Sequence, residues 1–192
     1  FRLKNDDGEL YDITYPAFLK TVRSLSQALA DYGLKGKKIA VVGKNSYKWC
    51  CTYFAVTCGI GVIVPIDKEL LSADIVGIIN ISGAEAVFFD EAEETKLCEV
   101  MDSLPSDLLL FAFHRKENEN RFLSYDRLLE SGKAVIDSGD ISVKDLPIDK
   151  NALSALLFTS GTTGAAKGVM LSQQNICSDI MSLSGVVKIT PE

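Results

Sequence analysis

Short apolar runs alternate with amphipathic stretches along most of this 192-residue chain. Four runs have the length and the β-branched character of buried strands, at residues 38–42, 62–66, 85–89 and 108–113. The stretches between them have helical periodicity, at residues 47–58, 72–81 and 91–104. Apolar strands that alternate with helices predict an α/β fold, with a largely parallel sheet covered by helices on both faces.

The first residues have a different pattern. Residues 1–14 are typical of a hairpin, because Asn5-Asp6-Asp7-Gly8 places turn-forming residues between two short strand-like runs. Thr14 then has the position of an N-cap for a helix with Phe18 and Leu25 on its apolar face. We therefore expect a hairpin at 1–14 and an alternating helix/strand unit at 15–117.

The remainder of the chain is divided by a less regular segment. Residues 118–152 have few periodic positions and predict a connection, with a short helix at 125–130. Residues 153–192 predict a phosphate loop between an apolar strand and a final helix, for which Ser172 is the N-cap. This last helix is expected to place four apolar side chains on one face: Ile176, Ile180, Leu183 and Val187.

Composition and charge exclude several classes of protein. The net charge is −6 and the lysines and arginines form no basic stripe, which argues against a broad nucleic-acid surface. Residues 49–66 carry no charge, but Gly59, Gly61 and Pro65 interrupt them, so we interpret them as a buried helix and strand rather than a transmembrane span. We expect a cytoplasmic protein, and peripheral contact with a membrane is left open.

Few side chains outside the last segment suggest chemistry. The five cysteines, Cys50, Cys51, Cys58, Cys98 and Cys177, have no metal or redox spacing and are interpreted as free thiols that act as small core residues in a reducing compartment. His114 is expected at the surface, and the acidic run 90–94 is expected to be a solvated helix start. Trp49, Tyr53 and Phe54 are interpreted as core residues rather than as an acyl pocket.

The loop at residues 159–168 is the most informative segment. It reads Thr159-Ser160-Gly161-Thr162-Thr163-Gly164-Ala165-Ala166-Lys167-Gly168. Glycines let backbone N–H groups approach an anion, hydroxyl groups donate hydrogen bonds to its oxygens, and a lysine supplies positive charge. Together these residue types predict a cradle for a polyphosphate.

Other glycine-rich motifs fit this loop less well. A Walker P-loop has its lysine directly after a glycine, whereas Ala165 and Ala166 separate Gly164 from Lys167 here. A kinase glycine-rich loop requires the spacing G-x-G-x-x-G, which is not found. A flexible Ser/Thr/Gly linker would not usually stand between an apolar strand and a capped amphipathic helix.

The segment from Leu156-Leu157-Phe158 to Leu171-Ser172 resembles the phosphate-loop signature of the adenylate-forming superfamily. This superfamily includes acyl-CoA synthetases, luciferases and the adenylation domains of peptide synthetases. Weaker similarities to the same superfamily extend over nearly the whole chain, at Thr14-Tyr15, Asn45-Ser46, Trp49, Gly61-Val62, Val64-Pro65 and Ile78-Ile79-Asn80. The run Gly168-Val169-Met170-Leu171-Ser172, followed by Asn175, is most similar to the long-chain fatty acyl-CoA synthetases.

Three residues depart from the family pattern. Ala166 stands where the family often has Pro, Gln173 where the acyl-CoA synthetases usually have His, and Lys48 where Glu is common. Loss of the proline implies a more mobile loop.

The resemblance implies a two-step reaction. A carboxylate, here a fatty acid, attacks the α-phosphorus of Mg-ATP to give an acyl-adenylate and pyrophosphate, and the thiol of coenzyme A then displaces AMP. By the same resemblance, Lys167 and the amides of residues 161–164 would hold the β- and γ-phosphates, and Thr159 would share Mg²⁺. Ser160, Thr162 and Thr163 would complete the phosphate-binding set.

Several segments of the superfamily have no counterpart in residues 1–192. They are the adenine-binding segment, the ribose-binding Asp motif, the hinge and the catalytic Lys of the C-terminal domain. We therefore expect an incomplete N-terminal part of the large AMP-binding domain, without catalytic residues and inactive alone, whose exposed apolar surface favours self-association. The alternatives are a non-catalytic nucleotide- or phosphate-binding module, a Walker-type NTPase, and an enzyme that adenylates aryl or amino acids.

Overall fold

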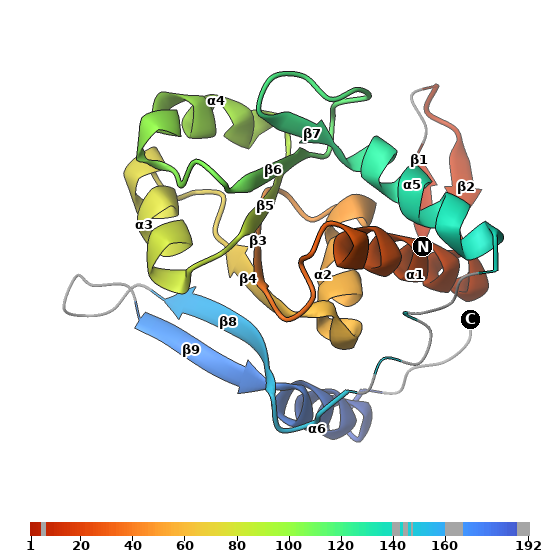
Figure 1. Cartoon of the computed structure of the whole chain (residues 1–192). Helices are drawn as coiled ribbons and strands as arrows, with labels where there is room; N and C mark the ends of the chain where they lie inside the picture. Colours follow the sequence, from red (N-terminus) through yellow and green to blue (C-terminus); the bar gives the residue numbers. More distant parts are fainter. Residues whose placement is uncertain (5–6, 140–142, 144–145, 147, 160–166, 188–192) are drawn as a thin grey trace.

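One mixed sheet dominates the computed structural model, which describes residues 1–4, 7–139, 143, 146, 148–159 and 167–187 (Figure 1). Within these residues the strand order is β7-β6-β5-β3-β4-β8-β9, and every neighbouring pair is parallel except β8 and β9. A separate antiparallel pair joins β1 (Arg2–Lys4) to β2 (Leu10–Asp12). The strands of the large sheet are β3 (Lys38–Val42), β4 (Val62–Ile66), β5 (Ala86–Phe89), β6 (Leu109–Ala112), β7 (Phe122–Ser124), β8 (Leu153–Thr159) and β9 (Lys167–Ser172).

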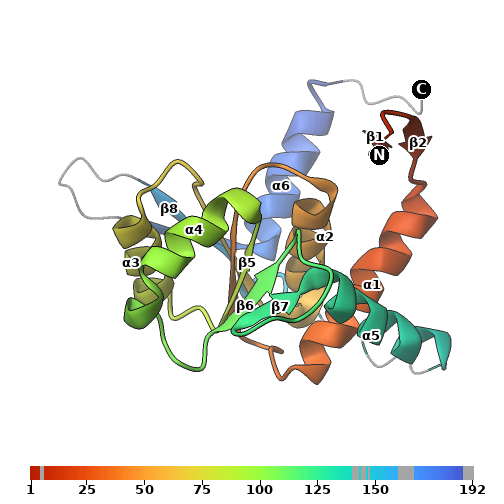
Figure 2. The same ribbon diagram turned by 90° about the horizontal axis from the view of Figure 1, so that it is seen from above.

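Helices cover both faces of this sheet, which confirms the predicted α/β class (Figure 2). Successive strand residues point to opposite faces, so Ile39 and Val41 pack with α1, α2 and α5, whereas Ala40 and Val42 pack with α3 and α4. Each face of the sheet thus carries a cluster of apolar side chains. The residues at the centre of both clusters are fully buried, as expected for a parallel sheet. The helices are α1 (Tyr15–Asp31), α2 (Tyr47–Ala55), α3 (Ser72–Ser82), α4 (Glu91–Glu99), α5 (Tyr125–Asp137) and α6 (Gln173–Ser184).

The uncharged stretch at 49–66 folds as a helix, a turn and a strand. The predicted helix at 47–58 ends earlier, at Ala55, and a wide π-helical turn over Val56–Ile60 follows, in which Gly59 has φ +113°. At Gly61 a Cβ atom would lie 2.1 Å from the carbonyl oxygen of Lys37, so only glycine allows these two backbone segments to lie so close together. No helix in the described part of the chain is both long and apolar enough to cross a membrane.

The structure differs from the predicted elements at two further places. The helix expected at 91–104 ends at Glu99, and Val100, with φ −118° and ψ 15°, leads into a short 3₁₀ turn. The segment 118–152, expected to be a connection, contains strand β7 and the 13-residue helix α5. The short helix predicted at 125–130 is only the first half of α5.

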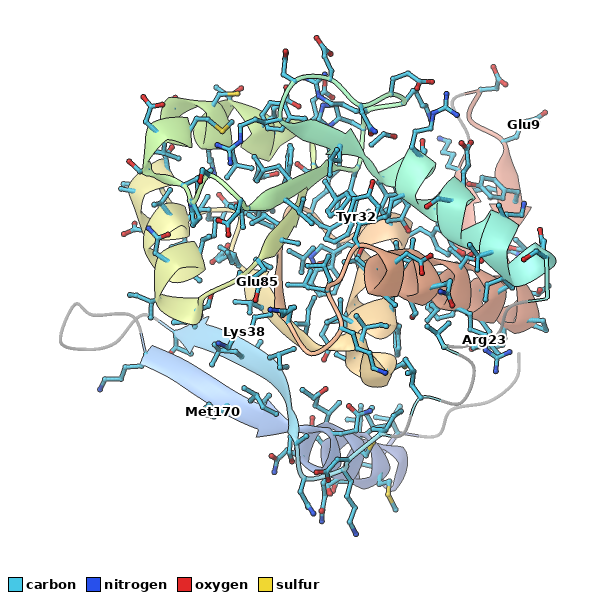
Figure 3. The ribbon with its side chains drawn as sticks, viewed as in Figure 1. Glu9, Arg23, Tyr32, Lys38, Glu85 and Met170 are labelled. Carbon is cyan, nitrogen blue, oxygen red and sulfur yellow. The ribbon has the colours of Figure 1, made fainter. Side chains whose placement is uncertain are left out.

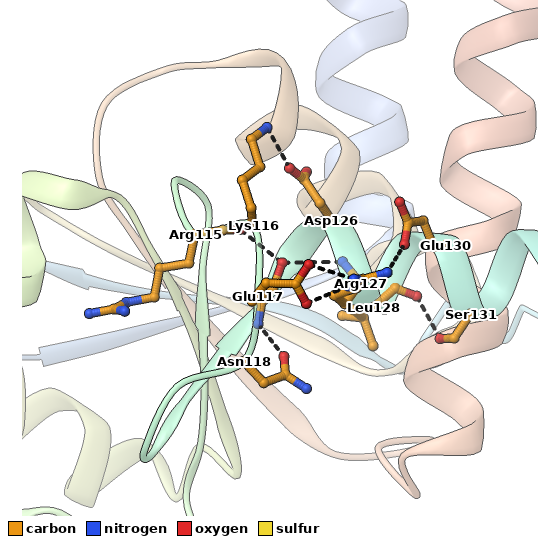
Figure 4. Close-up of polar contacts among 10 residues, drawn as sticks. Arg115, Lys116, Glu117, Asn118, Asp126, Arg127, Leu128, Glu130 and Ser131 are labelled. Carbon is orange, nitrogen blue, oxygen red and sulfur yellow. Dashed lines mark hydrogen bonds and ion pairs between the residues drawn. The ribbon is translucent and has the colours of Figure 1, made fainter.

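Polar contacts fix the beginning of α5 (Figure 4). The hydroxyl of Ser124 accepts a hydrogen bond from the Arg127 amide at 3.2 Å and so caps the helix. Lys116 pairs with Asp126 at 2.9 Å, and the Arg127 guanidinium contacts both Glu117 and Glu130. Exposed pairs of this kind contribute little individually to stability.

Helix α5 lies against α1 at one very close point. Gly132 is buried in the middle of α5, and a Cβ atom there would lie 1.9 Å from the carbonyl oxygen of Ser24 and 2.9 Å from the amide nitrogen of Ala28. The backbones of the two helices therefore touch, which requires a residue without a side chain.

The last strand and the last helix are largely exposed. Met170, on β9, is 67% exposed (Figure 3), and Met181, on α6, is 74% exposed. Of the four apolar residues expected on one helical face, Ile176 packs against the core, whereas Ile180, Leu183 and Val187 are exposed. No described element covers this apolar surface.

Candidate functional site

The two residues that flank the predicted phosphate loop lie opposite each other. Strands β8 and β9 are antiparallel, and their last pair in register is Thr159 with Lys167. Both residues are exposed. The structure thus brings together the hydroxyl-bearing and ammonium-bearing ends of the loop. The other predicted site residues lie outside the described residues: Ser160, Gly161, Thr162, Thr163 and Gly164.

The sheet sets where this loop begins. Strand β8 is parallel to β4, with Ala155 opposite Ile63, so its carboxyl end lies at the same edge as the carboxyl ends of β3 to β6. Leu156 and Phe158 pack against the apolar cluster that the sheet forms with α3 and α4. These contacts hold β8 in place as far as the residue before Thr159. In α/β sheets this carboxyl edge is the usual place for ligands.

Helix α6 secures the opposite end of β9. Ser172 and Asn175 form a reciprocal capping box, in which the Asn175 amide donates to the Ser172 hydroxyl at 3.2 Å and the Ser172 amide donates to Asn175 Oδ1 at 2.9 Å. Gln173 follows the cap, and its Oε1 accepts a hydrogen bond from the Ser154 hydroxyl at 2.8 Å. Gln173, which stands where the acyl-CoA synthetases usually have His, therefore lies beside the start of β8, whereas Thr159 is at the end of that strand.

The departure at Lys48 also has a structural role. The Lys48 ammonium donates to the carbonyl oxygen of Phe113 at 2.6 Å and pairs with the Asp126 carboxylate, so α2 is tied to the end of β6 and to α5. Burial opposes the charge of Asp126, but hydrogen bonds from Lys48 and Lys116 together lower the pKa of its carboxyl.

A cavity of about 880 Å³ lies at the carboxyl edge of the sheet, and sequence reasoning did not find it. The strand order reverses here, because β4 and β5 lie on opposite sides of β3. Parallel α/β sheets commonly bind ligands at such a switch point. The residues directly after β3 and β5 were therefore the part of the sequence that could have indicated this cavity. Its lining includes titratable residues that follow four strands: Lys44, Lys68, Asp90, Glu93, Lys96 and His114.

The acidic run in this cavity corrects the expectation of a fully solvated helix start. Glu93 is only 3% exposed, and burial together with contact from Asp90 raises the pKa of its carboxyl to about 7. Burial also disfavours the charge of Asp90, but hydrogen bonds from Glu93 and from the Lys44 and Ala92 amides lower its pKa. Of the acidic residues at 90–94, only Glu91 is exposed.

His114 and the cysteines can be compared with their predicted roles. His114 lies at the end of β6 with its side chain 27% exposed, and its Nε2 is 2.9 Å from Glu94, which also binds Arg115. The prediction that the cysteines fill the core is wrong for three of the five. Cys51 is buried and Cys50 is half-buried, whereas the exposed thiols are Cys58, Cys98 and Cys177.

The aromatic residues of α2 form a partly open cluster. Trp49 stacks on Tyr53 with ring centroids 5.6 Å apart, and both pack against the core from a half-buried position. Phe54 is 44% exposed, so it is not the core residue that was expected. In the described part of the chain, no group of three or more His, Cys, Asp or Glu residues could hold a metal ion.

The comparison with protein families identifies the family to which the chain belongs. The family model described as "AMP-binding enzyme" matches residues 3–191. This chain belongs to the AMP-binding enzyme family. The family prediction is thereby confirmed, and the match includes both the predicted phosphate loop and the strands on either side of it.

Relatives of this AMP-binding enzyme chain include several CoA ligases. It is 25% identical over 178 residues to long-chain-fatty-acid–CoA ligase FadD15 of Mycobacterium bovis, covering 91% of the chain and 28% of that protein. It is 30% identical over 168 residues to 4-hydroxybutyrate–CoA ligase 2 of Metallosphaera sedula, covering 82% of the chain and 29% of that protein. The chain thus spans less than a third of the length of these curated relatives.

Solved structures show the same fold. MbtA of Mycobacterium smegmatis superposes with a TM-score of 0.80 at 17% identity, over 99% of this chain and 34% of that one. A long-chain-fatty-acid CoA ligase from Rhodopseudomonas palustris gives a TM-score of 0.76 at 17% identity, over 97% of this chain and 44% of that one.

Proposed function

We propose that this chain is the N-terminal, phosphate-binding part of an ATP-dependent, AMP-forming acyl-CoA ligase. The observation that carries the proposal is the pairing of Thr159 with Lys167 at the carboxyl edge of the sheet, at the base of a loop of small and hydroxyl residues. The reaction is attack of a carboxylate on the α-phosphorus of ATP, with loss of pyrophosphate, followed by transfer of the acyl group to the thiol of coenzyme A.

Lys167 has the main electrostatic role in this proposal. Negative charge accumulates on the β- and γ-phosphates as pyrophosphate leaves, and an ammonium together with backbone N–H groups stabilises that charge. Lys167 and the amides of residues 161–164 bind these phosphates, and Ser160, Thr162 and Thr163 donate hydroxyl hydrogen bonds. Because Leu156 and Phe158 anchor β8 in the core, this strand fixes the position of Thr159, where the loop begins.

Thr159 is the residue of this set that we assign to Mg²⁺. Its hydroxyl is an oxygen ligand of the kind that Mg²⁺ accepts beside the phosphates of a nucleotide, and it lies on the exposed end of β8. A bound Mg²⁺ would neutralise part of the triphosphate charge. Thr159 itself would then orient the phosphates relative to Lys167.

For the acyl substrate, a fatty acid is supported by the relatives rather than by a pocket in this chain. Two of the proteins similar to it are named long-chain-fatty-acid–CoA ligase and fatty acyl-CoA synthetase. Gln173 is bonded to Ser154 at the far end of β8, so its difference from the usual His does not alter the phosphate site. An enzyme for aryl or amino acids is the alternative within the family.

The test is ATP–pyrophosphate exchange by the whole enzyme. We expect Lys167→Ala to slow exchange by about 100-fold, the effect typical of removing one preorganised transition-state donor. Lys133→Ala removes an exposed lysine from α5 and is the matched control, which should retain full exchange. If Lys167→Ala exchanged at the control's rate, Lys167 would have no part in adenylation.

A second experiment concerns residues 1–192 alone. The chain spans less than a third of its curated relatives, so we expect it to form no acyl-adenylate and to bind ATP weakly. Mass spectrometry of the product and calorimetric titration with ATP, AMP and pyrophosphate would measure both properties. Tight ATP binding without turnover would instead favour a non-catalytic nucleotide-binding module.

A further inference from the structure

Two enclosed side-chain atoms in the cavity at the carboxyl edge have no hydrogen-bond partner among the described residues. They are Oε2 of Glu93 and Nδ1 of His114, and both residues line the cavity. Buried polar atoms in folded proteins are nearly always paired, so each such atom requires an explanation. The proposed phosphate chemistry uses neither side chain. Because both atoms belong to one cavity, a single bound ligand would explain them together.

Glu93 lies in the first turn of α4, the helix that follows β5. It is only 3% exposed, although it lines the cavity, so its carboxyl group has little contact with bulk water. Burial and the nearby Asp90 raise the pKa of this carboxyl to about 7, because both disfavour its negative charge. A ligand group with a positive charge would therefore stabilise Glu93 more than a neutral one.

His114, which follows β6, supplies a second acceptor. Its Nε2 is 2.9 Å from Oε2 of Glu94, and two hydrogen bonds from Arg115 hold that carboxylate in place. A carboxylate can only accept, so the hydrogen between these two atoms belongs to Nε2. Nδ1 of the neutral ring is then an acceptor. Both atoms without a partner thus require a hydrogen-bond donor.

The lysines that line the cavity have other partners or lie at its exposed rim. The Lys96 ammonium donates to two backbone carbonyl oxygens that follow β4. Lys48 is bound at the end of β6 and to α5, and Lys68 forms an ion pair with the adjacent glutamate. Lys4 and Lys44 are exposed. None of these five ammonium groups donates to either of the two enclosed atoms.

The size and lining of the cavity fit an organic cation. A primary ammonium group carries one positive charge and three donors, which matches a buried carboxyl beside an imidazole acceptor. The volume of about 880 Å³ leaves room for a carbon chain. Apolar and aromatic residues that can cover such a chain also line the cavity: Leu3, Tyr11, Tyr47 and Phe113. A metal ion fits less well, because the described residues contain no group of three or more His, Cys, Asp or Glu ligands.

We propose that this cavity is a second ligand site, in which Glu93 and His114 bind the ammonium group of a small primary amine. Strands β3 and β4 lie between β5 and β8, so the start of the predicted phosphate loop is about 14 Å away across the sheet. The amine site is therefore separate from the proposed phosphate site, and it does not depend on the ligase function.

Calorimetric titration of the whole protein with butylamine hydrochloride at pH 8 tests the site. We expect saturable binding of one butylammonium ion per chain. Glu93→Gln should weaken it at least tenfold, since it replaces a charge-assisted hydrogen bond with a neutral one. Tetramethylammonium has the same charge but no N–H donor, so it should also bind at least tenfold more weakly than butylammonium. His114→Phe keeps a ring without Nδ1 and should weaken butylammonium binding severalfold.

Glu91→Gln is the matched control, because Glu91 is an exposed carboxylate that lines the same cavity. Its affinity for butylammonium should stay within twofold of wild type. Equal affinity of wild type and Glu93→Gln, or equal binding of the two cations, would overturn the proposal.

NMR titration of the unmodified protein gives an independent result if the variants do not fold. Butylammonium should shift the carbon-13 signal of the Glu93 carboxyl and the nitrogen-15 signal of His114 Nδ1 along one saturation curve. Absence of both shifts at saturating amine would show that the amine binds elsewhere or not at all, and the proposal would then be wrong.

Discussion

Replacement of Gly132 by alanine tests how closely α1 and α5 approach. A Cβ atom at this position would lie 1.9 Å from the Ser24 carbonyl oxygen and 2.9 Å from the Ala28 amide nitrogen. Both are backbone atoms inside α1, so no side chain can rotate away to make room. The two helices must separate by more than an ångström, which would open the core cluster between them.

The expected effect is the sum of two opposing contributions. Alanine is favoured over glycine inside a helix by about 1 kcal/mol. Overpacking a tight interface costs about 1–3 kcal/mol, and a backbone clash this short belongs at the upper end. Gly132→Ala should therefore lower the free energy of unfolding by about 2 kcal/mol, equivalent to a Tm decrease of about 4–8 °C for a chain of this size.

Gly77→Ala is the matched control for this prediction. Gly77 lies inside α3, and a Cβ atom there would meet nothing within 4 Å, so only the helix preference applies. We expect Gly77→Ala to raise the free energy of unfolding by about 1 kcal/mol. Urea and thermal unfolding followed by circular dichroism would measure both variants. Equal stabilisation by the two alanines would refute the close approach of α1 and α5.

Three further predictions follow from other contacts. Lys48→Met should cost about 1–2 kcal/mol at pH 7, because the Phe113 carbonyl and Asp126 lose a donor. The pKa of Asp126 is lowered in the folded state, so this deficit should shrink when urea unfolding is repeated below about pH 4. Thr14→Ala removes the N-cap of α1 and should lower stability by about 1 kcal/mol in the same assay. Thiol labelling of the native chain should find Cys51 unreactive, since burial raises its pKa to about 11, and fast reaction at Cys98 and Cys177. Cys58 should react more slowly than these two, since partial burial of its thiol raises its pKa.

The centre of the sheet was predictable because its signal is local. Strands buried on both faces must be apolar at nearly every position, as the runs at β3, β4, β5 and β6 are. Strand β7 has only three residues, too few to show a period. Helix α5 was underestimated because Gly132 lowers its local helix preference. That glycine is explained only by contact with α1, which is distant in sequence.

The predicted phosphate loop and the cavity lie at the same edge of the sheet, but only the loop has its pattern within a single segment of the sequence. The phosphate loop could be proposed from the sequence because its glycines, hydroxyls and lysine are consecutive and the chemistry of each residue type is known, and its role stays a prediction. The cavity beside it is assembled from the ends of separate strands, so no single segment contains its pattern. The burial of Glu93 was missed because an acidic residue at a helix start is usually solvated.

The exposure of β9 also matters for handling this chain in solution. Within the described residues β9 is the last strand of the sheet, and one side of its backbone pairs with β8 while the other has no partner strand. Free N–H and C=O groups on an apolar strand recruit further strands from neighbouring molecules. Preparations of residues 1–192 should therefore assemble edge to edge as concentration rises, and a lysine in place of Met170 would suppress that assembly without touching the core.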